Sequence, residues 1–169
     1  MPFSAIAVAN EFLKIAKKHD DSLSPMKLQK LVFYAHGWSL GLMGTPLISN
    51  QVEAWDWGPV IPELYHEFKR YGNGPITDCS RTFVLRDRKM VSVVPTLNEY
   101  PDSRERENAQ RIIERIWSLY GSSSPAKLSN STHAAGTPWA QVYEPGKRHI
   151  VIPDLMIKSY FEGLTDARQ

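Results

Sequence analysis

Two adjacent residues are the first candidates for metal chemistry. His66 and Glu67 lie between Pro62 and Tyr71, a stretch that we predict to be a helix. A His-Glu-x-x-His zinc site needs a second histidine four residues after the first, because both imidazoles must project from one helix face. This chain has Arg70 at that position, and no two of its five histidines are four residues apart. Packing or surface roles are therefore favoured for the histidines, and no metal is expected.

The single cysteine, Cys79, is the only candidate for a thiol nucleophile. It lacks the local signatures of cysteine protease families, so an enzyme would have to combine it with a distant histidine such as His133. The chain contains neither a glycine-rich phosphate loop nor a Gly-x-Ser-x-Gly nucleophile elbow. Together these patterns favour a protein that is not an enzyme and that needs no cofactor.

A cluster of aromatic residues offers binding chemistry instead. It surrounds the turn signal Gly58-Pro59 and consists of Trp55, Trp57, Tyr65 and Tyr71. Such residues usually pack in the core, and that role is favoured for at least one tryptophan. Trp and Tyr beside a rigid turn are also typical of interaction hot spots. If this segment is a strand, Trp55 and Trp57 share one face of it with Glu53.

Apolar periodicity and helix caps predict the elements that position these residues. Ser24-Pro25 and Ser124-Pro125 each combine an N-cap serine with a proline in the first helical turn. Asp102 and Glu105 resemble a capping box. We therefore predict helices over residues 4–18, 25–43, 62–71, 102–120 and 127–132, with a last helix that starts at Pro153.

The remaining segments predict a small amount of β-structure. Residues 81–85 and 89–94 are rich in Val, Thr and Phe and flank Arg86-Asp87-Arg88, which predicts a β-hairpin. Residues 47–57 predict a short strand or hairpin, and residues 139–149 a loop. The expected fold class is α+β: one domain over residues 1–169, mostly helical, with a small antiparallel element near 81–94.

The helix predicted at 25–43 has two distinct faces. Its core face is Leu28, Leu31, Val32, Ala35, Trp38 and Leu42. A different face carries Lys30, Tyr34, Gly37 and Gly41. Each glycine in a helix interior costs about 1 kcal/mol relative to alanine. We therefore expect another backbone to pack closely against this glycine face.

Composition and charge restrict the class of protein. The 169 residues are 42% hydrophobic and 22% charged, with a net charge of +2 and no strongly basic segment. Nucleic-acid binders usually carry a basic stripe, so a nucleic-acid partner is not favoured. No stretch approaches the ~18 apolar residues of a membrane helix, and Glu11 interrupts the apolar N-terminus, unlike a signal peptide. We predict a cytoplasmic protein, and a single cysteine suits that reducing compartment.

Three blocks of the sequence carry a family resemblance. The first is residues 25–37 (PMKLQKLVFYAHG) followed by Thr45-Pro46-Leu47, and the second is residues 53–65 (EAWDWGPVIPELY). The third combines Leu128-Ser129, Thr132-His133 and Pro138-Trp139. With these blocks the chain resembles the Panacea domain, the SocA-like antitoxin family that is also called phage-associated protein. The resemblance covers roughly residues 4–161.

The resemblance implies a function in binding. Members of this family neutralise toxins encoded beside them by direct protein contact, and prophages commonly carry such genes. An antitoxin with a cognate toxin as partner is thus implied. The first alternative, from the SocA-like branch, is a proteolytic adaptor that delivers the toxin to a ClpXP-type protease. The second is a DNA-binding regulator. Self-association stays open.

We predict a partner-binding surface beside the Gly58-Pro59 turn, formed by Lys30, Tyr34, Trp55, Trp57 and Tyr65. Lys30 and Tyr34 are four residues apart and share a helix face, which Gly37 and Gly41 continue. The alternative is that the two glycines pack on the chain's own Trp-Gly-Pro segment, which would make the motif a folding nucleus. The residues alone leave both interpretations open.

Overall fold

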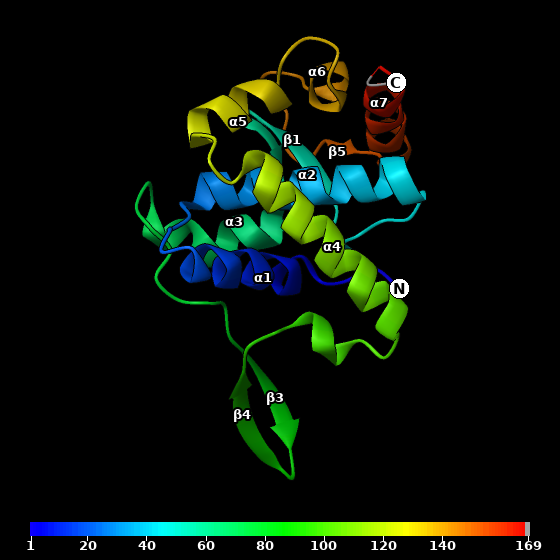
Figure 1. Ribbon diagram of the computed structural model, residues 1–169. Helices are drawn as coiled ribbons and strands as arrows, with labels where there is room; N and C mark the ends of the chain where they lie inside the picture. The colour runs from blue at the N-terminus through cyan, green and yellow to red at the C-terminus, as the bar shows by residue number, and fades with distance from the viewer. Residues whose placement is uncertain (168–169) are drawn as a thin grey trace.

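The helices of the protein surround one long central helix, α2 (Figure 1). The computed structural model describes residues 1–167. Within that range the helices are α1 (Ala5–Lys18), α2 (Pro25–Met43), α3 (Pro62–Phe68), α4 (Ser103–Tyr120), α5 (Pro125–Thr132), α6 (Pro138–Val142) and α7 (Asp154–Asp166). Two 3₁₀ turns, η1 (Lys69–Tyr71) and η2 (Leu97–Glu99), complete the helical structure. The mostly helical α+β class is confirmed.

The strands form two separate antiparallel sheets. One has the order β2-β1-β5, from β1 (Val52–Trp55), β2 (Gly58–Val60) and β5 (Val151–Ile152). The other is the hairpin of β3 (Thr82–Arg86) and β4 (Lys89–Val93), which confirms the hairpin predicted near 81–94. The predicted strand or hairpin at 47–57 is part of the first sheet.

The three caps predicted at Ser24, Asp102 and Ser124 are confirmed. The hydroxyl of Ser24 accepts from the backbone N–H of Lys27, and that of Ser124 accepts from Lys127. The Asp102 carboxylate accepts from the N–H of Glu105. In each case a side-chain oxygen pairs with an N–H that has no partner inside the helix, so these starts are encoded locally.

The central helix α2 is buried on every side rather than on one face. All residues from Lys27 to Leu40 are buried, because α1, α4, α5 and α7 each pack against it. The two ends of α2 are less covered: Pro25 and Met26 are half-buried, and Leu42 in the last turn is exposed. The assignment of Leu42 to the core was therefore wrong: periodicity places it on the apolar stripe, but near the end of α2 it lines an open surface depression with Ile112 and Leu119 of α4 and stays exposed.

The glycine face of α2 is covered by α7. A Cβ atom on Gly37 would lie 2.2 Å from the ring of Phe161, and one on Gly41 would lie 2.7 Å from the Phe161 Cβ. The expected close approach of another backbone is confirmed, since the Phe161 carbonyl carbon is 3.0 Å from that position at Gly41. The alternative that both glycines pack on the Trp-Gly-Pro segment is wrong, because α7 occupies this face.

Two details of the β-rich segments differ from the expectation. β1 ends at Trp55, which pairs with Gly58 across a two-residue turn, so Trp57 lies in the turn and does not share a strand face with Trp55. The stretch 139–149 was expected to be a loop throughout, but α6 extends to Val142. Among residues 1–167 no helix has the length and apolar character needed to cross a membrane.

The packing of α7 on α2 predicts the effect of filling the glycine face. Gly37→Ala gains helix propensity of about 1 kcal/mol, but its methyl group overlaps the Phe161 ring. We expect a net loss of about 1 kcal/mol or more in the free energy of unfolding, measured by urea denaturation. The matched control is Gly163→Ala on α7, which has no atom within 4 Å of its Cβ position and should be neutral or stabilising. Equal stability of the two variants would contradict the packing argument.

Candidate functional site: an aromatic surface on a clamped turn

A buried lysine holds the turn that follows β1. Lys30 on α2 is only 1% exposed. Its Nζ donates to the backbone carbonyl oxygens of Trp57 at 3.0 Å and Pro59 at 2.9 Å. In the described chain Lys30 makes no ion pair with a carboxylate, and its amine instead donates hydrogen bonds to these two carbonyls. Lys30 therefore fixes the turn to the central helix.

The neighbouring residue on α2 extends this attachment. The side-chain amide of Gln29 donates to the carbonyl of Ile61 at 2.9 Å and accepts from the N–H of Ile61 at 3.0 Å. A buried amide that pairs with both backbone groups of one residue satisfies four polar groups at once. The Gln29-Lys30 pair in the first family block thus binds the backbone of the second block.

Helix α5 also holds this turn. The Ser129 hydroxyl donates to the Trp57 carbonyl at 3.0 Å. Gly58 has φ +106°, and a Cβ there would lie 2.9 Å from the Lys30 Nζ and 3.1 Å from the Thr132 Oγ1. Only glycine fits this position. Residues of the third family block, on α5, therefore contact this turn. We call residues 57–59 the clamped turn.

The clamped turn presents aromatic side chains outward. Trp57 is 70% exposed and Tyr65, on α3, is 42% exposed. Half-buried Trp55 meets the Tyr65 ring edge-on, with centroids 4.8 Å apart. The Trp55 indole N–H donates to Glu53 at 2.8 Å, which confirms that those two residues share a strand face. We call Trp55, Trp57 and Tyr65 the aromatic surface.

Helix α6 supports the aromatic surface from one side. The Trp139 indole N–H donates to the Trp55 carbonyl. Its ring stacks on Tyr143 at 4.3 Å between centroids, and the Tyr143 hydroxyl donates to Asp56 at 2.6 Å. The Pro138-Trp139 pair of the third block thus contributes to the same construction.

The five residues predicted as a partner-binding surface fall into two groups. Trp55, Trp57 and Tyr65 form the aromatic surface, whereas Lys30 and Tyr34 are buried. The Tyr34 ring stacks on Tyr120 of α4 at 4.3 Å, and burial with that neighbour raises the pKa of Tyr34 to about 12. Lys30 acts from beneath the surface. The sequence argument missed Gln29, Ser129 and Thr132, although all three stand inside the family blocks.

The candidates for catalytic and metal chemistry are not grouped. Burial raises the pKa of the Cys79 thiol, which disfavours the thiolate that a nucleophile requires. Its depression is lined by Glu67, Arg70 and Asp78, without histidine. Across residues 1–167 no three His, Cys, Asp or Glu side chains lie together as a metal site would require.

Two histidines have identifiable structural roles. Buried His36 accepts from the N–H of Ile48 through Nδ1 at 3.4 Å and contacts the Asp154 carboxylate through Nε2 at 2.9 Å. It therefore links α2 to the segment before β1 and to α7. His133 ends α5, and its ring meets Trp139 at 5.3 Å. The Nδ1 atom of His133 is buried without a hydrogen-bond partner.

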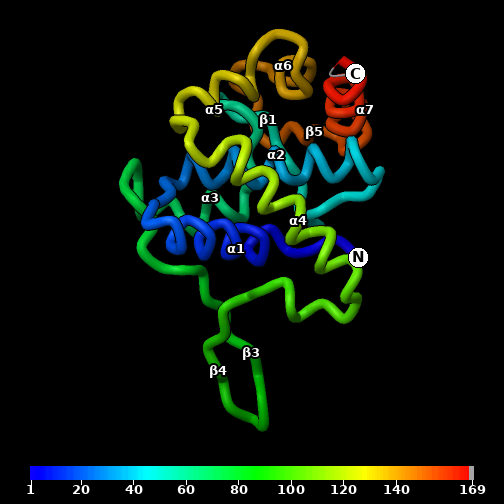
Figure 2. The backbone as a smooth tube through the Cα atoms, viewed as in Figure 1, coloured from blue at the N-terminus to red at the C-terminus, as the bar shows by residue number. Residues whose placement is uncertain are grey.

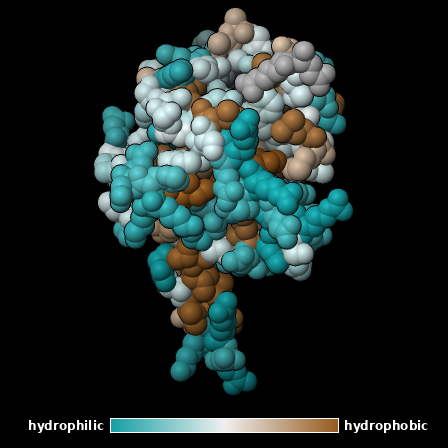
Figure 3. All heavy atoms as spheres, viewed as in Figure 1, coloured by the Kyte–Doolittle hydropathy of each residue, from teal (hydrophilic) through white to brown (hydrophobic). Residues whose placement is uncertain are grey.

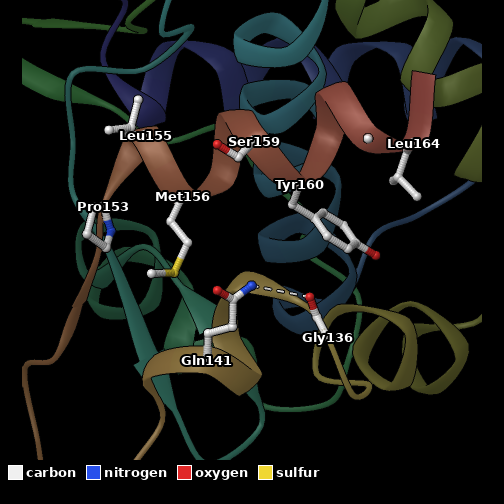
Figure 4. A pocket seen from close by; sticks show the side chains of 9 residues that line it. Gly136, Gln141, Pro153, Leu155, Met156, Ser159, Tyr160 and Leu164 are labelled. Carbon is white, nitrogen blue, oxygen red and sulfur yellow. Dashed lines mark hydrogen bonds between the residues drawn. The ribbon is translucent and has the colours of Figure 1, made fainter. Parts of the chain in front are cut away.

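A wide groove lies between α6 and α7 (Figure 4). Its volume is about 730 Å³. Met156 and Tyr160 of α7 face Gln141 of α6, whose amide donates to the Gly136 carbonyl at 3.3 Å. Among the described residues no charged side chain lines this groove, so this lining provides apolar contact rather than acid–base chemistry.

Comparisons with known proteins identify the family. Residues 28–140 match the family described as antitoxin SocA-like, Panacea domain. The chain is 33% identical over 135 residues to Antitoxin SocA of Caulobacter vibrioides (strain NA1000 / CB15N). The aligned residues make up 80% of this chain and 68% of that protein. No solved structure matches the chain significantly. The chain therefore belongs to the SocA-like Panacea domain family, as its sequence blocks predicted.

The burial of Lys30 predicts a pH dependence of stability. Burial lowers its pKa from 10.5 to about 7, so between these values the unfolded chain binds one more proton at this site than the native protein. The Lys30 contribution to the free energy of unfolding must then rise with pH across this window, by up to about 1.4 kcal/mol per pH unit. Below pH 7 the cost of the buried ammonium is fully present.

Urea unfolding at pH 7 and pH 9 measures this contribution. We expect the rise in stability between the two pH values to be smaller in Lys30→Met, which keeps the length of the side chain but removes the amine. Comparison of the two proteins removes the contributions of all other titrating groups. An identical rise in wild type and variant would show that Lys30 keeps its ordinary pKa in the native state.

Proposed function

We propose that this protein is an antitoxin that binds a cognate protein toxin directly and thereby holds it inactive, in the cytoplasm and without catalysis. Family membership carries the proposal: residues 28–140 match the antitoxin SocA-like Panacea domain, and the relative Antitoxin SocA is 33% identical. Both support an antitoxin role, which requires a toxin as partner.

The aromatic surface is the proposed contact for this toxin. Trp and Tyr provide large contact areas at low entropic cost and dominate binding energy in many interfaces. The Trp57 backbone accepts hydrogen bonds from Lys30 and Ser129, so its position is set before any partner arrives. Such preorganisation reduces the entropy lost on binding. Lys30 and Tyr34 support this surface rather than touch the toxin.

Co-expression with the product of the neighbouring gene tests the proposal. We expect that product to arrest growth when expressed alone, and growth to recover when this protein is present. The two proteins should also co-purify as a complex. The proposal would be overturned if the neighbouring gene product is harmless by itself, or if it stays toxic in the presence of this protein.

Masking and proteolytic delivery differ in one measurable quantity. Masking by direct binding protects cells even when the ClpXP-type unfoldase is absent, and the toxin level stays constant. A proteolytic adaptor would protect only in the presence of the unfoldase, with a falling toxin level. A DNA-binding regulator would instead show salt-sensitive binding to duplex DNA in a shift assay at two salt concentrations.

The aromatic surface gives the sharpest prediction for mutants. Trp57→Ala should weaken toxin binding by about 2 kcal/mol or more while it changes stability by less than about 0.5 kcal/mol, because the side chain is mostly exposed. Tyr34→Ala should lower stability by about 3 kcal/mol, since it empties a buried aromatic site. Leu155→Ala, at an exposed leucine of α7, is the control for both measurements. If Trp57→Ala binds the toxin like the wild type, the contact lies elsewhere.

A further inference from the structure

The β3–β4 hairpin stands apart from the rest of the molecule. In Figures 1 and 2 it projects away from the helical body, beyond α1 and the start of α4. Its strands pair only with each other among the described residues. The apolar side chains of the hairpin are absent from the hydrophobic core of the described chain. Packing inside the domain therefore does not explain why this hairpin is apolar.

One face of the hairpin carries three exposed apolar side chains. Phe83 lies opposite Ser92, and Leu85 lies opposite Met90, so these side chains share one face. Phe83, Leu85 and Met90 are 66%, 69% and 65% exposed. Figure 3 shows apolar atoms along the stem of the hairpin and hydrophilic atoms at its tip. We call Phe83, Leu85 and Met90 the arm face.

The arm face is bordered by positive charge. The hairpin tip contains Arg88 in the turn, and Arg86 and Lys89, which pair with each other on the opposite strand face, with only Asp87 as a counter-charge. At the base, the Arg81 guanidinium donates to the Ser92 hydroxyl at 2.8 Å. In the described chain none of these basic groups has a nitrogen within 4.0 Å of a carboxylate oxygen. The hairpin therefore offers an apolar surface with unneutralised cations at both ends.

The turn at the tip is held in a costly conformation. Asp87 and Arg88 have φ of +48° and +62°, in the left-handed region that glycine prefers in two-residue hairpin turns. A two-stranded hairpin without a packed face is only marginally stable in water. A partner that covers the apolar face of the hairpin would therefore stabilise it.

We propose that the arm face is a second contact for the toxin, which presents an apolar patch flanked by carboxylates. This inference rests on the proposed function and adds a site separate from the aromatic surface. Electrostatic complementarity identifies the occupant: cations on both sides of an apolar surface attract an acidic rim and repel a second copy of the same hairpin. Three exposed apolar side chains on one face favour a protein over nucleic acid, whose backbone offers charge but little apolar surface.

Two hairpin variants separate the apolar and the charged contributions. Leu85→Glu with Met90→Glu removes the apolar contact and should weaken binding of the purified toxin at least about thirtyfold. Arg86→Glu with Arg88→Glu reverses the charge and should weaken binding about tenfold at low salt, with a smaller effect at high salt. Both should melt at the wild-type temperature, because the hairpin lies outside the core.

Matched substitutions elsewhere control for the chemistry of each change. Leu155→Glu places a carboxylate at an exposed leucine of α7, and Arg111→Glu reverses a charge that is exposed on α4. Both should bind the toxin like the wild type. A photoreactive residue at position 83 should also cross-link to the toxin.

The outcomes distinguish this proposal from the function on which it rests. If wild type and hairpin variants bind the toxin equally, the arm assignment is overturned and the antitoxin proposal stands. If the wild type does not bind the toxin, both are overturned. Loss of self-association in the Leu85 and Met90 variant, with toxin binding unchanged, would identify an interface between two copies. Loss of duplex DNA binding in the arginine variant, again with toxin binding unchanged, would identify a nucleic-acid contact; either result overturns the proposal.

Discussion

The hydrogen bonds from the Lys30 amine to the Trp57 and Pro59 carbonyls are the interaction on which the functional part of the structure depends. A backbone carbonyl buried without a partner costs about 1–3 kcal/mol, so the tight turn can lie against α2 only if donors meet it there. Lys30 provides them from α2, and Ser129 provides another from α5. Gly58 then lets the three segments approach each other without a side chain between them. In this way three distant sequence blocks become one rigid unit.

The same central helix also organises the other side of the molecule. Gly37 and Gly41 leave room for Phe161, so α7 packs against α2 at close range. His36, between the two packing regions, contacts Asp154 at the start of α7. Polar side chains of α2 thus bind neighbouring segments by hydrogen bonds, while its apolar side chains pack in the core. A helix covered on all sides in this way ties the first and last parts of the chain together.

Surface features divide by the way they are supported. The aromatic surface rests on the clamped turn and on α6, which fix Trp57 and Trp55 through their backbones. The β3–β4 hairpin, by contrast, carries its apolar side chains on a projection that only its own strand pairing holds. The backbone of the first surface is held by hydrogen bonds from α2, α5 and α6, whereas the second has little intrinsic stability. Both surfaces expose apolar side chains.

Local signals determined much of this protein from its sequence. Helix starts depend on caps within one turn, and the β3–β4 hairpin depends on neighbouring residues, so both were predictable. The family blocks predicted the correct family for the same reason, because each is a continuous motif. Only the tertiary structure decided that Lys30 and Tyr34 are buried and that Leu42 is exposed. Periodicity identifies which residues share a helix face, but which faces are covered depends on the helices that pack there. For α2 those are α1, α4, α5 and α7, and the last three come from distant parts of the chain.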